Sequence, residues 1–517
     1  MDVIYVKQAL ILEEAKKVYK KFACSEDPME SLYMIDIIQR LGIEHHFAEE
    51  IEKQYLILNN INPIEFVNSH ELYDVALTFR LLRQGGHYVN PDLFDSLMCN
   101  KRNFREKYGN DMKGLIAMYE ASQLSMEGED ILNDIGNFSS ELLHTWLSRN
   151  QNCNEAIYVA NTLQYPLHYG LSRFMDNNNI FLSGLKANNE WTCLEELANI
   201  NSNIVRIMNQ NEIIEVSKWW KEDIGMSKEP KFVMYQPLKW YMWPMTCFTD
   251  PNFSEQRIEL TKVISLIYVV DDIFDVHGTL DQLTLFTDAA KRWELAGTEK
   301  LPDFMKNCLS LIYKITNEFA EKVYKKHGLN PIDTLKKSWE RFLNSVLKEA
   351  HWFNSGYLAK ADEYLKNGID STGVHLVLVH SFFLFNHIIQ EQTIAILDHE
   401  FPNIIYSVAT ILRLSDDLEG AAKSGDQNGL DGSYIDCYTN EHQDISSEEA
   451  QTHVANMISN EWKRLNQEII NPNPIFPSSF INFCLNVARM VPLMYHYGSN
   501  SNPSLSNLQQ FVKSLIS

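Results

Sequence analysis

LTKVISLIYVVDDIFD, from Leu260 to Asp275, decides the fold: it is an apolar run that ends in a group of aspartates. Asp271 and Asp275 are four residues apart, so a helix puts them on one face, with Asp272 about 100° round. Neighbouring carboxylates at the end of an apolar helix repel one another and lose hydration. Coordination of Mg²⁺, a hard cation that prefers oxygen ligands, removes this conflict. A solvated acidic helix end has the same spacing, so spacing alone leaves both interpretations open.

A second acidic group, RLSDD from Arg413 to Asp417, closes another apolar run, IIYSVATIL. Arg413 precedes Asp416 by three residues, so a guanidinium on a neighbouring helix face could bind an anionic ligand; a local ion pair is the alternative. If the two acid-tipped helices face each other across a bundle, they can hold several Mg²⁺ ions at the mouth of an apolar cavity. This arrangement suits ionisation of an allylic diphosphate, because metals neutralise the leaving group and the cavity limits water.

Helical periodicity runs through the rest of the chain. LYMIDIIQRL, from Leu32 to Leu41, places Met34, Ile38 and Leu41 at helical spacing. The apolar run over 404–414 could be a strand in isolation, but its length and its helical neighbours favour a buried helix. Only 21 Gly and 16 Pro in 517 residues leave few breaks between helices. We therefore predict an all-α fold, with a domain boundary near residue 200, inside the asparagine-containing stretch 187–203.

Charge and cysteine content exclude several classes of protein. The net charge of −23 argues against nucleic acid or an anionic membrane surface as a partner, since both reward clustered Lys and Arg. The 8 cysteines are scattered without any CxxC pair, so neither a zinc site nor a disulfide framework is indicated. No apolar run reaches the roughly 20 residues that span a bilayer. Because Glu13 and Glu14 come early and Arg40 is the first arginine, the N-terminus does not read as a transit peptide, and we expect a cytoplasmic monomer.

Blocks of sequence along nearly the whole chain resemble, in family order, those of the plant terpene synthases. The blocks are ALTFRLLRQGGHYVN (Ala76–Asn90), LQYPLHYGLSRF (Leu163–Phe174), EVSKWWKEDIG (Glu215–Gly225), QPLKWYMW (Gln236–Trp243), EYLKNGIDSTG (Glu363–Gly373) and VARMVPLMYHYG (Val487–Gly498). The resemblance implies two helical domains: an N-terminal relict α-barrel over 1–200 and a C-terminal class I terpenoid-synthase bundle, the catalytic metal-binding domain, over 201–517.

The resemblance also implies roles for particular residues. Asp271 and Asp275 would ligate Mg²⁺, for which Mn²⁺ is an alternative, and Asp272 would support them. Asp416 would ligate a further ion and Arg413 would bind diphosphate. Two aromatic side chains match cavity positions of the family, where their π-faces can stabilise cations; the alternative is that they are ordinary core aromatics. They are Trp243 and Tyr495.

The chain departs from the family pattern in its second metal motif, (N/D)Dxx(S/T)xxxE. Counted from Asp416, the Ser/Thr position is Gly420 and the Glu position is Ser424. A one-residue shift in this loop would let Ser424 or Asp426 serve as a ligand, with water filling the gap. The departure predicts weaker diphosphate binding, and with it lower activity.

Two arginine features of the family are missing as well. The arginine pair expected before Trp243 is replaced by Met234 and Gln236, and Lys239 could substitute only as a point charge. No tandem arginine occurs anywhere in the chain. In lacking this tandem arginine, and in its segments QPLKWYMW and DQNGLDGSYIDCY, the chain resembles the linalool and nerolidol synthases, which make acyclic alcohols.

We therefore expect an enzyme that ionises a prenyl diphosphate and lets water capture the tertiary end of the cation. Farnesyl diphosphate would give nerolidol and geranyl diphosphate would give linalool. Because farnesyl diphosphate is the prenyl diphosphate supplied in the cytosol, we expect it to be the main substrate of a cytosolic enzyme. Three alternatives stay open: a cyclic sesquiterpene synthase, a chain-elongating prenyltransferase, and a weakly active helical binding protein. The prenyltransferase is disfavoured because RLSDD and the residues after it supply no second full Asp-rich motif.

Overall fold

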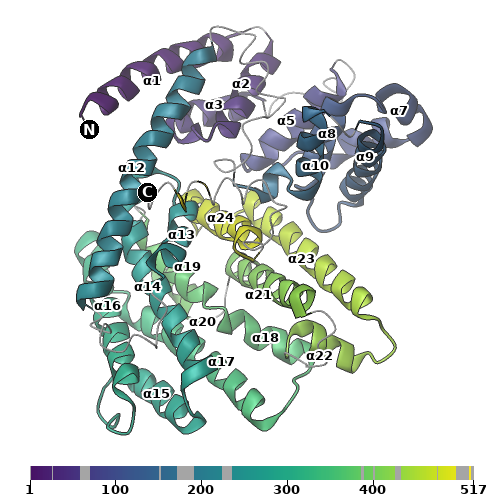
Figure 1. Cartoon of the computed structure of the whole chain (residues 1–517). Coiled ribbons are helices and arrows are strands. Elements are labelled where there is room, and N and C mark those ends of the chain that lie inside the picture. Colours follow the sequence, from purple (N-terminus) through teal and green to yellow (C-terminus); the bar gives the residue numbers. More distant parts are fainter. Residues whose placement is uncertain are drawn as a thin grey trace. The chain divides into compact units, whose positions relative to one another are not determined.

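Every regular element in the described part of the chain is a helix, which confirms the all-α prediction (Figure 1). The computed structural model describes residues 2–25, 27–58, 70–150, 153–171, 191–223, 236–385, 389, 391–399, 402–424, 432–473, 475–495, 510 and 512–513. Across these ranges, none of the helices combines the length and apolar character needed to cross a bilayer.

Contacts divide the chain into two compact units. One comprises Met1–Ile207, Asn466–Pro472 and His496–Ser517, and the other comprises Met208–Leu465 and Asn473–Tyr495. Helices α12 (Thr192–Asp223) and α23 (Ser447–Ile470) contribute residues to both units. The boundary expected near residue 200 stays a prediction, since units defined by contacts need not coincide with domains.

The N-terminal unit packs its helices around one apolar core that contains a buried network of charges. Arg40 contacts Asp36 and Glu120, each at 2.9 Å, and Arg80 also bonds Asp36. Pairing in this way offsets the cost of removing the charges from water. The helices are α1 (Asp2–Ala23), α2 (Pro28–Arg40), α3 (Ala48–Leu58), α5 (Leu72–Gln84), α6 (Asp95–Met98), α7 (Lys101–Tyr108), α8 (Met112–Ser122), α9 (Asp130–Arg149) and α10 (Asn154–Gln164).

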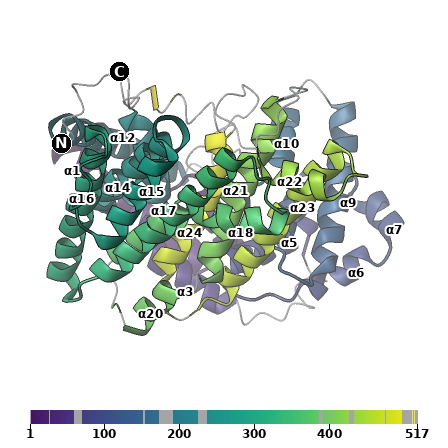
Figure 2. The ribbon, with the colours of Figure 1, turned by 90° about the horizontal axis from the view of Figure 1, so that it is seen from below.

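The C-terminal unit is a bundle in which α13, α14, α19, α21 and α24 pack on one another, with α17 and α18 beside them. Figure 2 shows α17, α18 and α21 running next to each other when the unit is seen from below. The helices are α13 (Pro237–Cys247), α14 (Ser254–Asp272), α15 (Leu280–Arg292), α16 (Asp303–His327), α17 (Ile332–Ser355), α18 (Ala361–Ser371), α19 (Val374–Leu384), α20 (Glu391–His399), α21 (Asn403–Ser424), α22 (Tyr434–Glu441) and α24 (Ser478–Tyr495).

Three local features of the bundle position the site. The apolar run over 404–414 lies within α21, so the helical reading was correct. Helix α14 does not stop at Asp272 but widens into a π-helical turn, Ile273–His277, of the kind that often occurs at functional sites. Helices α18 and α19 are separated by a break at Gly373, whose φ of +67° is the left-handed conformation that suits glycine.

Candidate active site

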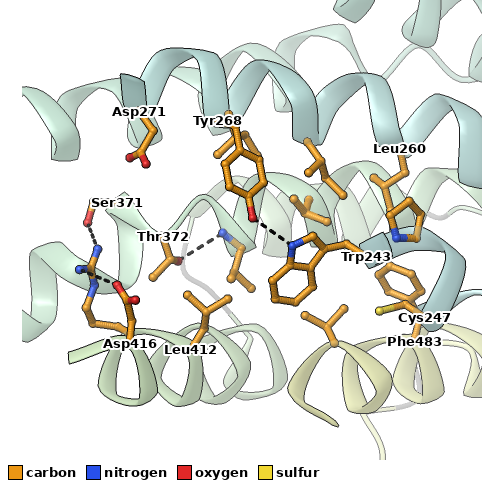
Figure 3. Close-up of a pocket in the computed structure, with 17 residues that line it drawn as sticks. Trp243, Cys247, Leu260, Tyr268, Asp271, Ser371, Thr372, Leu412, Asp416 and Phe483 are labelled. Atoms are coloured by element: carbon orange, nitrogen blue, oxygen red, sulfur yellow. Dashed lines mark hydrogen bonds and ion pairs between the residues drawn. The ribbon is translucent and has the colours of Figure 1, made fainter. Parts of the chain in front are cut away.

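A cavity of about 170 Å³ lies inside the C-terminal bundle, charged at one end and apolar at the other (Figure 3). Asp271, Asp416 and Ser371 lie together at the charged end, whereas Trp243 and Phe483 lie toward the apolar end. The full lining is Trp243, Pro244, Cys247, Leu260, Ile264, Ile267, Tyr268, Asp271, Ser371, Thr372, Val374, Val377, Leu412, Arg413, Asp416, Phe483 and Val487.

The first acidic group surrounds the end of α14. Solvent reaches Asp271 through the cavity, yet the surrounding protein desolvates its carboxylate and, with the charge of Asp275, raises its pKa to about 7. Asp275 lies in the π-helical turn, and burial together with the charge of Glu349 raises its pKa too. Asp272 closes α14 and its charge adds to the repulsion on both neighbours. Because Arg413 lowers the pKa of both Asp271 and Asp275, the aspartates and this arginine belong to one electrostatic site.

Arg413 projects from α21 toward the break after α18. Its Nη2 donates to Ser371 Oγ at 3.0 Å, its Nη1 to the Tyr364 hydroxyl at 3.3 Å, and its Nε to the Gly368 carbonyl at 3.4 Å. A Cβ added at Gly368 would come within 3.1 Å of the Arg413 side chain, which would have to shift by a few tenths of an ångström. The guanidinium is thus held in one orientation by these hydrogen bonds, with the carboxylates of Asp417 and Asp416 3.8 and 4.0 Å from its Nη1.

The two carboxylates of RLSDD have different roles. Asp417 is buried and accepts from the Tyr364 hydroxyl at 3.0 Å and from the Tyr434 N–H at 3.1 Å. Burial raises the pKa of Asp417 to about 6 despite the opposing charge of Arg413. Asp416 lines the cavity, with 48% of its side chain exposed, and its carboxylate is 4.0 Å from Arg413 Nη1. Asp416 therefore faces the cavity while Asp417 supports the local structure.

Several residues singled out from the sequence lie at the ends of the described ranges or outside them. Ser424 and Tyr495 are the last residues of α21 and α24, and their side chains are outside the described set. Met234 and Asp426 are wholly outside the described residues. Gly420 lies in α21, one helical turn after Asp416, and brings no side chain there.

Trp243 lines the cavity, accompanied by Tyr268, which was not singled out in the sequence, and by Lys239, which was. The Trp243 indole N–H donates to the Tyr268 hydroxyl at 3.2 Å. Lys239 Nζ lies 4.8 Å from the centre of the Tyr268 ring, a cation–π distance. Lys239 lies one helical turn before Trp243 on α13. It thus brings a positive charge beside the ring of Tyr268, which lines the cavity.

Sequence reasoning missed Glu349. This residue of α17 accepts from Ser371 Oγ at 2.6 Å and from Asn367 Nδ2 at 3.2 Å, so a chain of hydrogen bonds joins it through Ser371 to Arg413. A signal was present: Glu349 continues the buried stripe of α17 that includes Phe342 and Val346, where an acid is out of place unless it has a specific partner.

The carboxylate oxygens at the charged end of the cavity fit a divalent cation. Across the described residues no three His, Cys, Asp or Glu side chains converge into a ready-made metal cage. Mg²⁺ does not require one, because it is usually held by one or two carboxylates together with waters and substrate phosphates. Asp271 and Asp416 offer carboxylates from two helices, and a cation near Asp271 and Asp275 would relieve the repulsion that raises the pKa of both.

Matches to known families cover most of the chain. Residues 3–166 match the family described as "Terpene synthase, N-terminal domain", and residues 222–464 match "Terpene synthase family, metal binding domain". The chain therefore belongs to the terpene synthase family, which confirms the resemblance. It is an enzyme acting on prenyl diphosphates, and its metal-binding domain indicates dependence on a divalent metal ion.

Curated relatives match over nearly the full length. The chain is 66% identical to "Neryl diphosphate diphosphatase, chloroplastic" of Glycine max, over 100% of this chain and 96% of the relative. It is 43% identical to an (E)-nerolidol synthase of Cannabis sativa, over 96% and 90% of the two chains. It is 41% identical to "S-(+)-linalool synthase, chloroplastic" of Arabidopsis thaliana, over 97% and 87%.

Solved structures share the fold. The chain superposes with a TM-score of 0.88 on isoprene synthase from grey poplar leaves, Populus x canescens, crystallised with three Mg²⁺ ions and dimethylallyl-S-thiolodiphosphate. The two are 29% identical, and the match covers 97% of this chain and 96% of that one. The two-domain class I terpenoid-synthase fold is thereby confirmed.

The expected cytoplasmic location is wrong, because the Glycine max and Arabidopsis thaliana relatives are both named chloroplastic. The expectation rested on the composition of the first residues. Those residues form α1, a helix of the N-terminal unit, so their acids reflect the surface of a folded helix and not the presence or absence of a targeting signal.

Proposed function

We propose that this enzyme ionises a ten-carbon prenyl diphosphate and releases an acyclic alcohol after capture of the cation by water. The observation that carries the proposal is the cavity itself: Asp271 and Asp416 lie at one end, the other end is apolar, and Arg413 lies beside Asp416 and Ser371. A diphosphate fits the charged end and a hydrocarbon chain fits the apolar end.

In this proposal each residue acts through its chemistry. Arg413 binds diphosphate oxygens, oriented by Ser371 and through it by Glu349. Mg²⁺, held by the carboxylates, would supply the positive charge that draws the bonding electron pair onto the leaving group. The metal-binding residues proposed are Asp271, Asp275 and Asp416, with Asp272 in support and Ser424 or Asp426 completing the second site.

The aromatic residues would stabilise the cation that remains. Trp243 presents its indole to the cavity, and Tyr495 is proposed for the same role. A π-face contributes about 0.5–2 kcal/mol to a nearby cation. The catalytic part is proposed to be the domain over 201–517, and the domain over 1–200 the relict α-barrel.

Chain length and product follow from two further arguments. The expectation of farnesyl diphosphate depends on a cytosolic supply of that substrate, which the chloroplastic relatives no longer support. One of these relatives is named for neryl diphosphate. A cavity of about 170 Å³ accommodates a ten-carbon chain more readily than a fifteen-carbon one. Neryl and geranyl diphosphate are therefore the proposed substrates, with acyclic C10 alcohols, linalool among them, as products and a plastid as the location.

The test is incubation of purified protein with neryl, geranyl and farnesyl diphosphate and Mg²⁺, with separation of the volatile products by mass and measurement of released diphosphate. We expect acyclic C10 alcohols. Asp271→Ala should reduce diphosphate release by at least ~100-fold, the size of an electrostatic catalytic contribution. Asp281→Ala, at an exposed position in the first turn of α15, is the matched control and should retain full release. Mainly cyclic hydrocarbons would contradict the acyclic assignment.

A further inference from the structure

Tyr268 is a polar side chain in the part of the cavity that is otherwise apolar. It lies one helical turn before Asp271 on α14, and Figure 3 shows its hydroxyl hanging into the cavity between Asp271 and Trp243. A substrate with its diphosphate near Asp271 and its chain toward Trp243 would pass this hydroxyl with its first few carbon atoms.

Among the residues that the structure describes, none accepts the hydroxyl proton of Tyr268. The oxygen accepts from the Trp243 indole N–H at 3.2 Å, and no described residue accepts the proton of the hydroxyl in return. Burial raises the pKa of Tyr268 to about 12, so the phenol stays protonated and able to donate. A buried donor without an acceptor is costly unless a ligand or a water molecule takes it.

The other hydroxyls that line the cavity are already engaged. Thr372 Oγ1 donates to the Ile369 carbonyl at 2.9 Å and accepts from the Val374 N–H at 3.2 Å. Ser371 Oγ donates to Glu349 at 2.6 Å and accepts from Arg413 at 3.0 Å. Tyr268 is thus the lining hydroxyl, among the described residues, with donor capacity left for something inside the cavity.

We propose that the Tyr268 hydroxyl holds the water molecule that captures the allylic cation. This inference rests on the proposed function and names the residue that makes the product an alcohol. The hydroxyl donates to one lone pair of the water oxygen and leaves the other lone pair to attack carbon. Trp243 fixes the phenol from the opposite direction by donating to its oxygen.

The step balances without any further reagent. The ester C–O bond breaks and its electron pair leaves with diphosphate. A new C–O bond forms from the water oxygen to the allylic carbon, and the extra proton of the resulting oxonium passes to the released diphosphate. Without a positioned water, the cation instead loses a proton from a neighbouring carbon and becomes a hydrocarbon, so the two outcomes can be counted as separate products.

The experiment compares wild type with Tyr268→Phe, which keeps the ring and removes the hydroxyl. The protein is incubated with neryl or geranyl diphosphate and Mg²⁺ in ¹⁸O-labelled water, and labelled alcohol, hydrocarbon and diphosphate are measured. We expect the ratio of alcohol to hydrocarbon to fall by about five-fold or more, the factor that one hydrogen bond supplies. Diphosphate release should fall by less than about three-fold, because the charged end of the cavity is unchanged.

Thr372→Val is the matched control, since it removes a hydroxyl that lines the same cavity but is satisfied by its own helix. Its alcohol ratio should stay that of wild type. An unchanged ratio in Tyr268→Phe, or an equal loss in Thr372→Val, would overturn this inference while leaving the proposed function intact. Wild type that releases no diphosphate would overturn both. If Tyr268→Phe does not fold, Tyr268→Met also lacks the hydroxyl and tests the same ratio with a side chain that fills irregular gaps.

Discussion

Asp271 is placed where its charge is unfavourable until a partner arrives. Desolvation and Asp275 raise its pKa to about 7, so near neutral pH a substantial share of the molecules carry a protonated Asp271. In the proposed function, a cation bound there would displace that proton, which would couple metal binding to proton release. A carboxylate whose charged form is disfavoured by burial and by Asp275 is suited to respond to a metal–diphosphate pair.

Phe483 is the residue we expect to limit chain length. Its ring lines the apolar end of the cavity and is backed by Phe248, at 4.4 Å between ring centres, and by Phe385, at 6.0 Å. A ring held on its far side cannot move to admit a longer chain. Phe483→Leu should therefore raise kcat/KM for farnesyl diphosphate relative to geranyl diphosphate, by about ten-fold or 1.4 kcal/mol.

Phe480→Leu is the control for Phe483→Leu. Phe480 is buried on the same helix and packs against Phe382, Phe385 and Phe476, but it does not line the cavity. Both variants lose similar packing, so their melting temperatures report that shared loss. If the two variants change the substrate ratio equally, the effect comes from general loosening of α24 and not from the end of the cavity.

At the scale of elements, the sequence predicted helices well and their irregularities poorly. The runs over 260–270 and 404–414 are long and apolar, and their length and surroundings favoured a buried helix for each. The π-helical turn after Asp272 could not be read, because its residues satisfy an ordinary helix equally well. Glu349 carried a signal in its place on the buried stripe of α17, but its partner Ser371 is on another helix, and a single sequence carries no information on which helices become neighbours.

The break between α18 and α19 is the irregular element most open to test. A Cβ at Gly373 would be 3.0 Å from Ile267, in a left-handed conformation that alanine resists. Gly373→Ala should lower the free energy of unfolding by about 1 kcal/mol for the backbone and roughly 1–3 kcal/mol more for the overpacking. It should also raise KM, because Ser371 and Thr372 enter the cavity from this break.

Gly328→Ala separates the two contributions to that loss. Gly328 follows α16 with a φ of +72° and has nothing within 4 Å of an added Cβ, so only the backbone cost applies. Urea unfolding of both variants, with kcat and KM for geranyl diphosphate, gives the comparison. Equal losses of stability and an unchanged KM in Gly373→Ala would show that the break does not position the cavity residues.

For the whole molecule, a net charge of −23 opposes an anionic substrate. The composition therefore gave no indication of a diphosphate substrate. In the proposed function, binding depends on local groups, since Arg413, Lys239 and a bound metal ion would have to outweigh the acids at the end of the cavity. At distances beyond the ~8 Å Debye length of physiological salt, the remaining acids are largely screened, which permits this local exception.

Two buried histidines in α19 should make the stability of the whole protein depend on pH. Burial lowers the pKa of His375 to about 3 and that of His380 to about 4, against 6.5 for an ordinary histidine. Between these values the unfolded chain binds more protons than the folded one, so the free energy of unfolding falls as pH drops below about 6.5. By linkage each histidine costs roughly 2 kcal/mol at pH 5 and almost nothing at pH 7.5.

Removal of one of these histidines should flatten the pH dependence. Asp271 and Asp417, with raised pKa values, act in the opposite sense over the same window, so only a difference between variants isolates the histidine. His380→Gln should lose about 2 kcal/mol less than wild type between pH 7.5 and pH 5, whatever its stability at either end. His351→Gln, at an exposed position on α17, should keep the wild-type slope in urea unfolding. Parallel slopes for His380→Gln and wild type would mean that His380 is not held neutral by burial.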